Sequence, residues 1–244
     1  MILILGGTGD AHKLAEAFQL TGVEFVVSLA GVTKRAPMRN YPTRTGGFGG
    51  AAGLVEYLGK KEITGVIDAT HPFAESISSS AVEAVSAVGV PLIRFVRQAW
   101  DTGDCPCVPD LDAAASALPA GARAFLTLGG QSLGPFIPRS DVWFLFRIID
   151  PMENPFVQGE ALVQRPPFTF GSELAVMKTH NITHLVTKNA GGNQTRAKLD
   201  AATQLGVQVI MVERPVLPVV ESASTVSGIL RWAEAIKEHP RGKL

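Results

Sequence analysis

The chain has 244 residues, 46% of them hydrophobic, and its 22 Lys and Arg side chains balance its 22 Asp and Glu side chains. This length and apolar content indicate one large or two ordinary globular domains and exclude a disordered protein. With zero net charge and no apolar run of about 18 residues, the chain is expected to bind neither nucleic acid nor membranes.

The first stretch predicts a strand, a glycine turn and a helix. Ile2 to Leu5 is an uninterrupted apolar run, followed by Gly-Gly-Thr-Gly-Asp at 6–10 and a helical stretch over 10–20. Glycines allow a sharp turn and close approach to a ligand, and the N–H groups that begin the next helix attract phosphate. The match to G-x-G-x-x-G is partial, because His12 replaces the third glycine. This stretch predicts a pyrophosphate site, with an ordinary tight turn as the alternative.

Strands and helices alternate through the rest of the first half. Strands are predicted at 24–28, 43–45, 65–68 and 91–95, and helices at 51–61 and 72–88. This spacing is typical of a parallel sheet covered on both faces. The stretch 97–109 is predicted to be a linker. It contains Cys105-Pro-Cys107, which suits neither a redox motif nor a zinc site and is expected to hold plain thiols.

The second half repeats the scheme, and Leu-Thr-Leu-Gly-Gly at 126–130 echoes Leu-Ile-Leu-Gly-Gly at 3–7. Strands are predicted at 124–128, 142–149, 161–164, 184–187 and 207–212, and helices at 193–205 and 224–238. We therefore predict an α/β protein with two Rossmann-like domains, parallel sheets and a cleft between them. The domains are expected at 1–98 and 110–244, with the C-terminal helix able to pack back on the first. Ligands should bind at the carboxyl ends of the strands.

The second strand indicates which nicotinamide nucleotide is preferred. An NAD site places Asp or Glu about 20 residues after the glycines, whereas an NADP site avoids that acid and supplies cations. Here Ser28 and Ala30 end the strand, and Lys34, Arg35 and Arg39 follow. NADP is therefore favoured, with Ser28 and one of these basic residues near the 2′-phosphate; a solvated basic loop is the alternative.

Two further loops are candidates for cofactor contact. The stretch 46–50 has four glycines around Phe48, which suits close backbone approach and packing on adenine or nicotinamide, unless it is a flexible hinge. Asp68 and His71 follow the fourth strand, where they could donate a proton or position the nicotinamide. The alternative is a structural cap, with Pro72 in the first helical turn and Thr70 or His71 capping it.

The second half offers cations for an anionic substrate. Lys188 directly follows the predicted strand at 184–187 and is expected to face the same cleft. Arg94, Arg97, Arg165 and Arg214 also lie at or after predicted strands, and arginine suits bidentate carboxylate recognition. Individually, each of these basic residues could instead be a solvated surface residue.

Six segments taken together resemble the precorrin-6A reductase family of cobalamin biosynthesis. They are Ile-Leu-Gly-Gly-Thr-Gly-Asp at 4–10, Ser-Leu-Ala-Gly at 28–31, Arg-Thr-Gly-Gly-Phe-Gly-Gly at 44–50, Asp-Ala-Thr-His-Pro-Phe-Ala at 68–74, Val-Thr-Lys-Asn-Ala-Gly-Gly at 186–192 and Glu-Arg-Pro at 213–215. The third and fourth segments are the most specific. The resemblance implies NADPH-dependent reduction of one double bond in the precorrin-6A macrocycle, giving precorrin-6B.

The resemblance and the motifs together give the candidate site residues. The cofactor-binding candidates are Gly7, Thr8, Gly9, Asp10, Ser28, Ala30, Lys34, Arg35, Gly47, Phe48, Gly49, Asp68, Thr70 and His71. The candidates for contact with the tetrapyrrole are Arg97, Lys188, Asn189, Gly191 and Arg214, and those for catalysis are Asp68, His71 and Lys188. Where the family often has Arg, this chain has Val32, so Lys34 or Arg35 is expected to contact the phosphate.

Two other functions fit part of the sequence. An NADP-sensing regulatory protein without turnover would explain the first half but not the polar loops of the second. A short-chain-type reductase would need Tyr-x-x-x-Lys, which Tyr57 and Lys61 match only formally, since they lie too early in the chain. The start of the chain lacks the features of a secretory signal, so a cytoplasmic protein is expected. No metal is expected, and the sequence does not reveal the oligomeric state.

Overall fold

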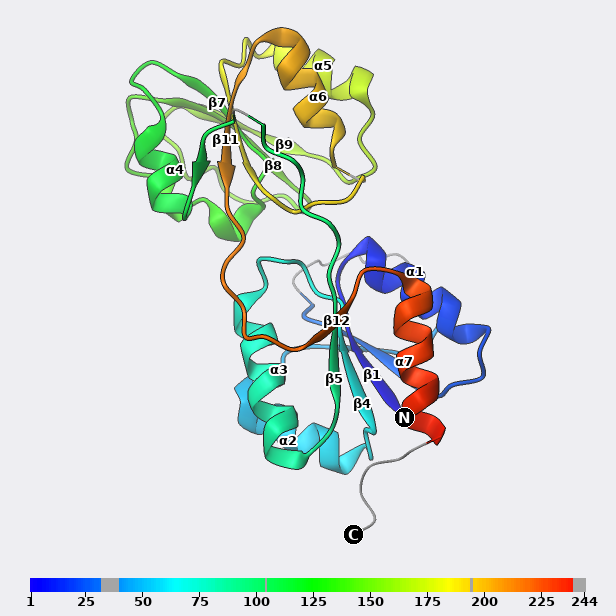
Figure 1. The fold of residues 1–244 in the computed structure, drawn as a ribbon. Coiled ribbons are helices and arrows are strands. Elements are labelled where there is room, and N and C mark those ends of the chain that lie inside the picture. Colours follow the sequence, from blue (N-terminus) through cyan, green and yellow to red (C-terminus); the bar gives the residue numbers. More distant parts are fainter. Residues whose placement is uncertain (32–39, 104, 194, 239–244) are drawn as a thin grey trace. The chain divides into compact units, whose positions relative to one another are not determined.

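The computed structural model describes residues 1–31, 40–103, 105–193 and 195–238, and they form two compact units (Figure 1). Unit 1 comprises Met1–Arg97 and the segment from Pro215 onward, and unit 2 comprises Gln98–Arg214. The second domain was predicted over 110–244. In the structure the chain returns to unit 1 after Arg214, and the C-terminal helix α7 (Val226–Glu238) packs there against α1 (Gly9–Gln19).

Unit 1 contains a six-stranded parallel sheet. Its strands are β1 (Ile2–Leu5), β2 (Phe25–Leu29), β3 (Thr43–Thr45), β4 (Gly65–Asp68), β5 (Leu92–Phe95) and β12 (Glu221–Ala223). They lie in the order β3-β2-β1-β4-β5-β12, which is the order of the Rossmann dinucleotide-binding sheet. The strand order therefore reverses between β1 and β4, and the carboxyl ends of these strands frame a crevice for a ligand.

The alternation of side chains along β1 explains the layers of unit 1. Ile2 and Ile4 are packed with the apolar side chains of α1 and α7, whereas Leu3 and Leu5 are packed with α2 (Gly50–Lys60) and α3 (Glu75–Val88). All four β1 side chains are at most 2% exposed, because successive residues of a strand point to opposite faces. A strand buried on both faces needs the uninterrupted apolar run seen in the sequence.

Unit 2 repeats this architecture. Its strands are β6 (Cys107–Val108), β7 (Arg123–Leu126), β8 (Trp143–Ile148), β9 (Gly159–Val163), β10 (His184–Lys188) and β11 (Gln208–Val212), in the parallel order β9-β8-β7-β10-β11-β6. Helices α5 (Phe170–Thr179) and α6 (Ala197–Leu205) pack on the face that carries Phe125 and Leu145. Helix α4 (Leu111–Ala117) packs on the 3₁₀ turn η2 (Gly134–Phe136), whose Phe136 contacts Phe144.

The structure confirms two Rossmann-like units with parallel sheets and corrects three details. The predicted linker 97–109 contains β6, which is the first of six consecutive strands in unit 2. The unpredicted β12 completes the sheet of unit 1 and comes from the segment that follows unit 2. Helix α3 begins at Glu75 instead of Pro72. His71 precedes Pro72, and the residue before a proline disfavours helical backbone geometry. Residues 71–74 therefore form a turn, closed by a hydrogen bond from the Ala74 amide to the His71 carbonyl, and the helix begins after it.

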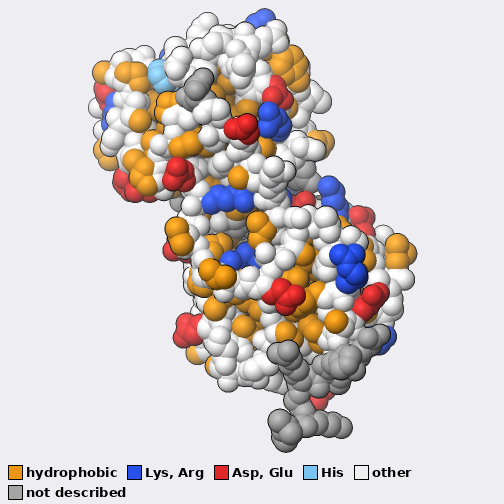
Figure 2. Space-filling view, in the orientation of Figure 1, with side chains coloured by type: hydrophobic (Ala, Val, Ile, Leu, Met, Phe, Trp, Pro, Cys, Tyr) orange, Lys and Arg blue, Asp and Glu red, His pale blue; other side chains and the backbone are white. Residues whose placement is uncertain are grey.

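In the described residues, none of the helices has the length and apolarity to cross a membrane. Figure 2 shows acidic and basic side chains together on both units in this view, in keeping with the equal numbers of the two kinds.

Candidate functional site

The turn between β1 and α1 is built to approach a ligand closely. Gly7 adopts a φ of +111°, which disfavours any other residue. The Thr8 hydroxyl accepts a hydrogen bond from the Ala11 amide and donates one to the Ala69 carbonyl, so it caps α1 and ties the turn to the loop after β4. Helix α1 therefore presents its N-terminal end at the carboxyl edge of the sheet, where an anion is favoured.

Asp10 lies in the first turn of α1 and forms an ion pair with Arg97, with 3.2 Å between Oδ2 and Nη1. Burial lowers the pKa of Arg97, and the Asp10 carboxylate opposes that shift. Arg97, which was predicted to contact the substrate, belongs to unit 1 and pairs there with the carboxylate in the first turn of α1. The pair neutralises a carboxylate that would otherwise repel a phosphate at this helix end.

A pocket of about 250 Å³ lies at the carboxyl edge of the unit 1 sheet. It brings together six of the predicted cofactor residues, which are Ser28, Ala30, Gly47, Phe48, Gly49 and Thr70. Leu5, Gly6, Gly46, Gly50, Ser76, Ile77 and Ser80 complete the lining. Ser76 and Ser80 were not predicted; their i, i+4 spacing on α3 was the signal that they share one helix face.

The glycine-rich loop 46–50 is held close to α2. Gly49 and Gly50 have φ of +81° and +86°, and a Cβ on Gly47, Gly49 or Gly50 would meet no atom within 4 Å, so these glycines border open space. Gly53 is different, because its Cβ would overlap the carbonyl group of Phe48. Phe48 packs edge-on against Tyr57 of α2, with 5.2 Å between ring centroids.

Arg44 stands beside this pocket and was not among the predicted site residues. Its Nη1 donates to Ser28 Oγ at 2.6 Å and its Nη2 donates to the Gly47 carbonyl at 3.2 Å. Its guanidinium carbon lies 4.1 Å from the Phe48 ring centroid. The predicted phosphate ligands Lys34 and Arg35 lie outside the described residues.

Asp68 is a buried anchor for the loop after β4. Its Oδ1 accepts hydrogen bonds from the amide and the hydroxyl of Thr70, and its Oδ2 accepts from Ser78 Oγ at 2.7 Å and Arg94 Nε at 2.9 Å. The residue is 1% exposed. The carboxylate therefore fixes Thr70, which lines the pocket, and holds α3 and β5 to β4.

His71 follows Asp68 in the same loop. Its Nδ1 accepts a hydrogen bond from the Phe73 amide at 3.3 Å. This bond assigns the hydrogen of a neutral ring to Nε2. The neutral ring can therefore donate a hydrogen bond from Nε2.

In unit 2, Lys188 lies at the end of β10 and contacts the loop after β7. Its Nζ donates to Ser132 Oγ at 2.7 Å, and the Leu128 carbonyl is 3.5 Å away. Burial lowers the pKa of Lys188. The ammonium and the Ser132 hydroxyl thus gather at the carboxyl edge of the second sheet, where two hydrogen-bond donors suit a carboxylate.

Asn189, Gly191 and Arg214 hold the two connections between the units onto the loop after β10. The Asn189 side chain accepts from the Trp100 amide at 2.9 Å and donates to the Trp100 carbonyl at 3.2 Å. Arg214 donates to the carbonyls of Asn189 and Ala190. A Cβ on Gly191 would overlap the Gln98 carbonyl, so the glycine permits the chain to pass there.

Unit 2 also contains a cluster of buried charged side chains. Lys198 is 6% exposed, and its Nζ donates to Thr127 Oγ1 at 3.0 Å. Arg147 and Glu173 form a buried pair with 2.7 Å between Nη1 and Oε1. Burial lowers the pKa of Lys198 to about 7; Glu173 opposes the shift and Arg147 adds to it.

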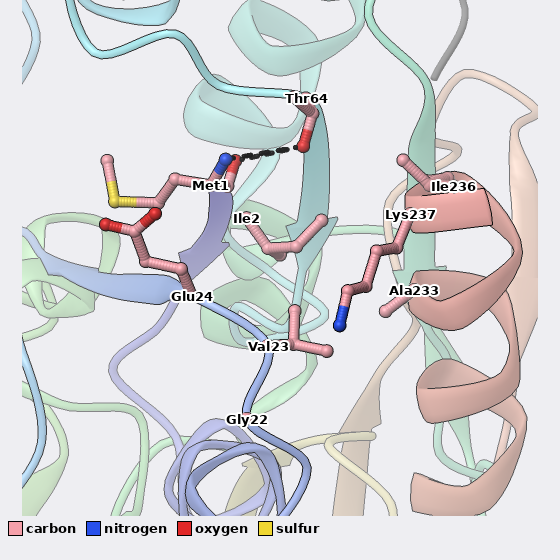
Figure 3. Close-up of a pocket in the computed structure, with 9 residues that line it drawn as sticks. All are labelled: Met1, Ile2, Gly22, Val23, Glu24, Thr64, Ala233, Ile236 and Lys237. Carbon is pink, nitrogen blue, oxygen red and sulfur yellow. Dashed lines mark hydrogen bonds between the residues drawn. The ribbon is translucent and has the colours of Figure 1, made fainter. Parts of the chain in front are cut away.

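A second pocket, of about 320 Å³, lies at the amino end of β1 (Figure 3). Its lining is mostly apolar, including Ile2, Val23, Ala233 and Ile236, with Glu24 and Lys237 also present. The Met1 ammonium donates to Thr64 Oγ1 at 3.5 Å on one side. Ligands of open α/β sheets bind at the opposite, carboxyl edge, so the smaller pocket is the better candidate for the cofactor site.

Within the described ranges 1–31, 40–103, 105–193 and 195–238, no three His, Cys, Asp or Glu side chains gather in a way that could hold a metal ion.

Comparison with known proteins gives a consistent result over the whole chain. The sequence pattern of the family described as precorrin-6x reductase CbiJ/CobK matches residues 1–234. The precorrin-6A reductase of Rhodobacter capsulatus is 43% identical over 247 residues, covering 99% of this chain and 98% of that protein. The precorrin-6A reductase of Rhodococcus erythropolis is 43% identical, covering 95% and 96%. A solved structure titled CobK precorrin-6A reductase superposes with a TM-score of 0.91 at 41% identity, covering 99% of both chains.

Proposed function

The chain belongs to the precorrin-6x reductase family CbiJ/CobK and is an oxidoreductase of cobalamin biosynthesis, and from this premise we propose that it reduces precorrin-6A with NADPH to give precorrin-6B. The observation that carries the cofactor assignment is the pocket of about 250 Å³ at the switch in strand order of unit 1. Its lining includes Gly6, where the glycine turn before α1 begins, and the glycine-rich loop 46–50 with the Phe48 ring. Gly7 to Gly9 and the N-terminus of α1 directly follow Gly6 in the chain, and a glycine turn with a helix N-terminus is the arrangement that binds a dinucleotide.

The residues around the pocket fit such a nucleotide. The glycines at 47, 49 and 50 border open space, so the chain leaves room where a side chain would otherwise project. The turn at Gly7 to Gly9 and the N-terminus of α1 would hold the pyrophosphate. Ser28, Phe48 and Thr70 would contact the nucleoside parts, and Asp10 would stay neutralised by Arg97. When bound, NADPH supplies the hydride.

The protein's own task in the reaction is then mostly positioning. Asp68 fixes Thr70 in the pocket wall through two hydrogen bonds, so its contribution to catalysis is indirect. His71 can offer a hydrogen from Nε2 while its Nδ1 is held by the Phe73 amide, which suits a hydrogen-bond donor to cofactor or substrate. The proton that completes the reduction comes from such a donor or from water.

Unit 2 would supply the contacts to the tetrapyrrole. Lys188 and Ser132 form a cationic hydrogen-bonding pair at the carboxyl edge of its sheet, and the substrate's side chains are carboxylates. Asn189 and Arg214 would act indirectly, by holding the loop after β10 in place. Gly191 would also act indirectly, by leaving space for the backbone at Gln98.

The test is anaerobic absorbance spectroscopy of the purified protein with NADPH and precorrin-6A. Loss of the nicotinamide band in a one-to-one ratio with the spectral change of the pigment is expected, with precorrin-6B as the product by mass spectrometry. Binding of NADPH without oxidation would refute the proposal and favour a nucleotide sensor. A matched reaction with NADH tests the cofactor separately from the reduction.

A further inference from the structure

We propose that Arg44 selects the phosphorylated dinucleotide by binding the 2′-phosphate on its adenosine ribose. The inference rests on the proposed use of NADPH and names the residue responsible for it. Arg44 lies in the middle of β3, directly opposite Ser28 in the register of β2 and β3. The end of the second strand is where Rossmann proteins read the ribose 2′ position.

The charge around this position suits a phosphate. NAD-binding proteins place an acid there to hold the ribose hydroxyls, but this chain has no Asp or Glu between Glu24 and Glu56. A phosphate at the ribose 2′ position would therefore meet a guanidinium and a serine hydroxyl instead of a repelling carboxylate.

The Arg44 guanidinium is already fixed in place by the protein. It donates to Ser28 Oγ at 2.6 Å and to the Gly47 carbonyl at 3.2 Å, and both of these residues line the nucleotide pocket. Its carbon lies 4.1 Å from the Phe48 ring centroid and 5.1 Å from that of Tyr57. An arginine held this way loses little further side-chain freedom on binding a ligand.

The two hydrogen bonds leave donors for a phosphate. A guanidinium has five N–H groups, of which these two bonds use one each. Because Ser28 Oγ accepts its hydrogen bond from Arg44, the hydroxyl hydrogen of Ser28 can be donated to a phosphate oxygen beside the guanidinium. Arg44 and Ser28 together form a charged and a neutral donor at one wall of the pocket.

A purely structural role for Arg44 makes a different prediction. If Arg44 only held β3 against the loop 46–50, its loss would weaken the binding of all adenine nucleotides to the same extent. A role at the 2′-phosphate concerns only nucleotides that carry this group. The ratio of affinities for NADPH and NADH therefore separates the two roles, and it is measured without turnover.

The experiment is calorimetric titration of the wild type, Arg44→Gln and Arg44→Lys with NADPH, NADH, 2′,5′-ADP and 5′-AMP. Because Arg44→Gln removes charge-assisted hydrogen bonds, it should lower the affinity for NADPH and 2′,5′-ADP by about 10- to 100-fold. The affinities for NADH and 5′-AMP should stay nearly unchanged. Arg44→Lys should keep part of the preference. The matched control is Arg123→Gln, which removes a guanidinium stacked 3.8 Å from Trp143 in unit 2 and should change none of these affinities.

Each outcome decides the matter. An equal loss for all four ligands, or no loss for any, would overturn the assignment of Arg44. A wild type that binds NADH as tightly as NADPH would instead refute the proposed cofactor, whatever the variants do. If Arg44→Gln does not fold, phosphorus NMR of bound NADP⁺ still tests the proposal, because Arg44→Lys should shift the 2′-phosphate resonance and its titration; an unchanged resonance would contradict it.

Discussion

Replacing Lys198 by Met should remove a large part of the pH dependence of stability. Lys198 is buried, with Nζ bonded to Thr127 and the Arg147–Glu173 pair nearby. Burial lowers its pKa in the folded protein to about 7, well below the 10.5 of a solvated lysine. The unfolded chain therefore binds more protons than the folded one between these two values, and stability rises with pH across that range.

The size of the effect follows from the two pKa values. Each pKa unit is worth about 1.4 kcal/mol, so raising the pH from about 7 to about 9 should stabilise the wild type by about 2 kcal/mol through Lys198 alone. Below about pH 7 this contribution no longer changes, because both states then carry the proton. Met has a similar length and no charge, so Lys198→Met should lack this increment.

The assay is urea unfolding at several pH values between about 6 and 10, followed by tryptophan fluorescence. Trp100 is a suitable reporter, since its ring lies 5.5 Å from Lys198 Nζ. The matched control is Lys178→Met on α5, where the side chain is exposed and the pH dependence should match the wild type. If Lys198→Met and the wild type gain the same free energy of unfolding over this range, Lys198 keeps an ordinary pKa and the reasoning is wrong.

Three further predictions concern the two sheet edges. Gly53→Ala should cost about 2 kcal/mol of thermal stability and weaken the binding of 2′,5′-ADP in titration, because its Cβ overlaps a carbonyl of the glycine-rich loop. Gly59→Ala, in the same helix but with open space for its Cβ, should not destabilise the protein and should leave the affinity for 2′,5′-ADP unchanged. Asp68→Asn should cost about 3 kcal/mol in urea unfolding, since it leaves the charge of Arg94 unpaired at a largely buried site, and a loss below about 1 kcal/mol would contradict the anchor role. Lys188→Met should raise KM for precorrin-6A about tenfold at constant NADPH affinity, whereas a parallel loss of NADPH affinity would argue against a substrate role.

The main strands could be predicted because burial on both faces demands a continuous apolar run. Ile2–Leu5 and Gly65–Asp68 match their predicted bounds. The edge strands β6 and β12 could not be predicted, since Cys107–Val108 and Glu221–Ala223 are short and partly exposed. Their extended conformation depends on pairing with the neighbouring strand, β11 for β6 and β5 for β12.

The candidate site was predictable where local chain geometry defines it. The glycines and Phe48 of the loop 46–50 were identified from their spacing alone, and they line the pocket. Arg44 was not predicted because its proposed role depends on Ser28, which lies opposite it on another strand. The bonds of Asn189 to Trp100 cross 89 residues of sequence, and no local pattern reveals such a partner.

The division of the chain also sets an order of completion during synthesis. Unit 2 is one continuous stretch from Gln98 to Arg214, so it can close as soon as that stretch has left the ribosome. Unit 1 starts first but is finished last, because β12 and α7 complete its sheet and cover Ile2 and Ile4. Until α7 is made, this apolar face of the nascent unit lacks part of its cover. A nascent chain stalled before Val226 should therefore have a folded unit 2 and an incomplete, aggregation-prone unit 1. Unit 1 is then the part of the chain expected to need a chaperone.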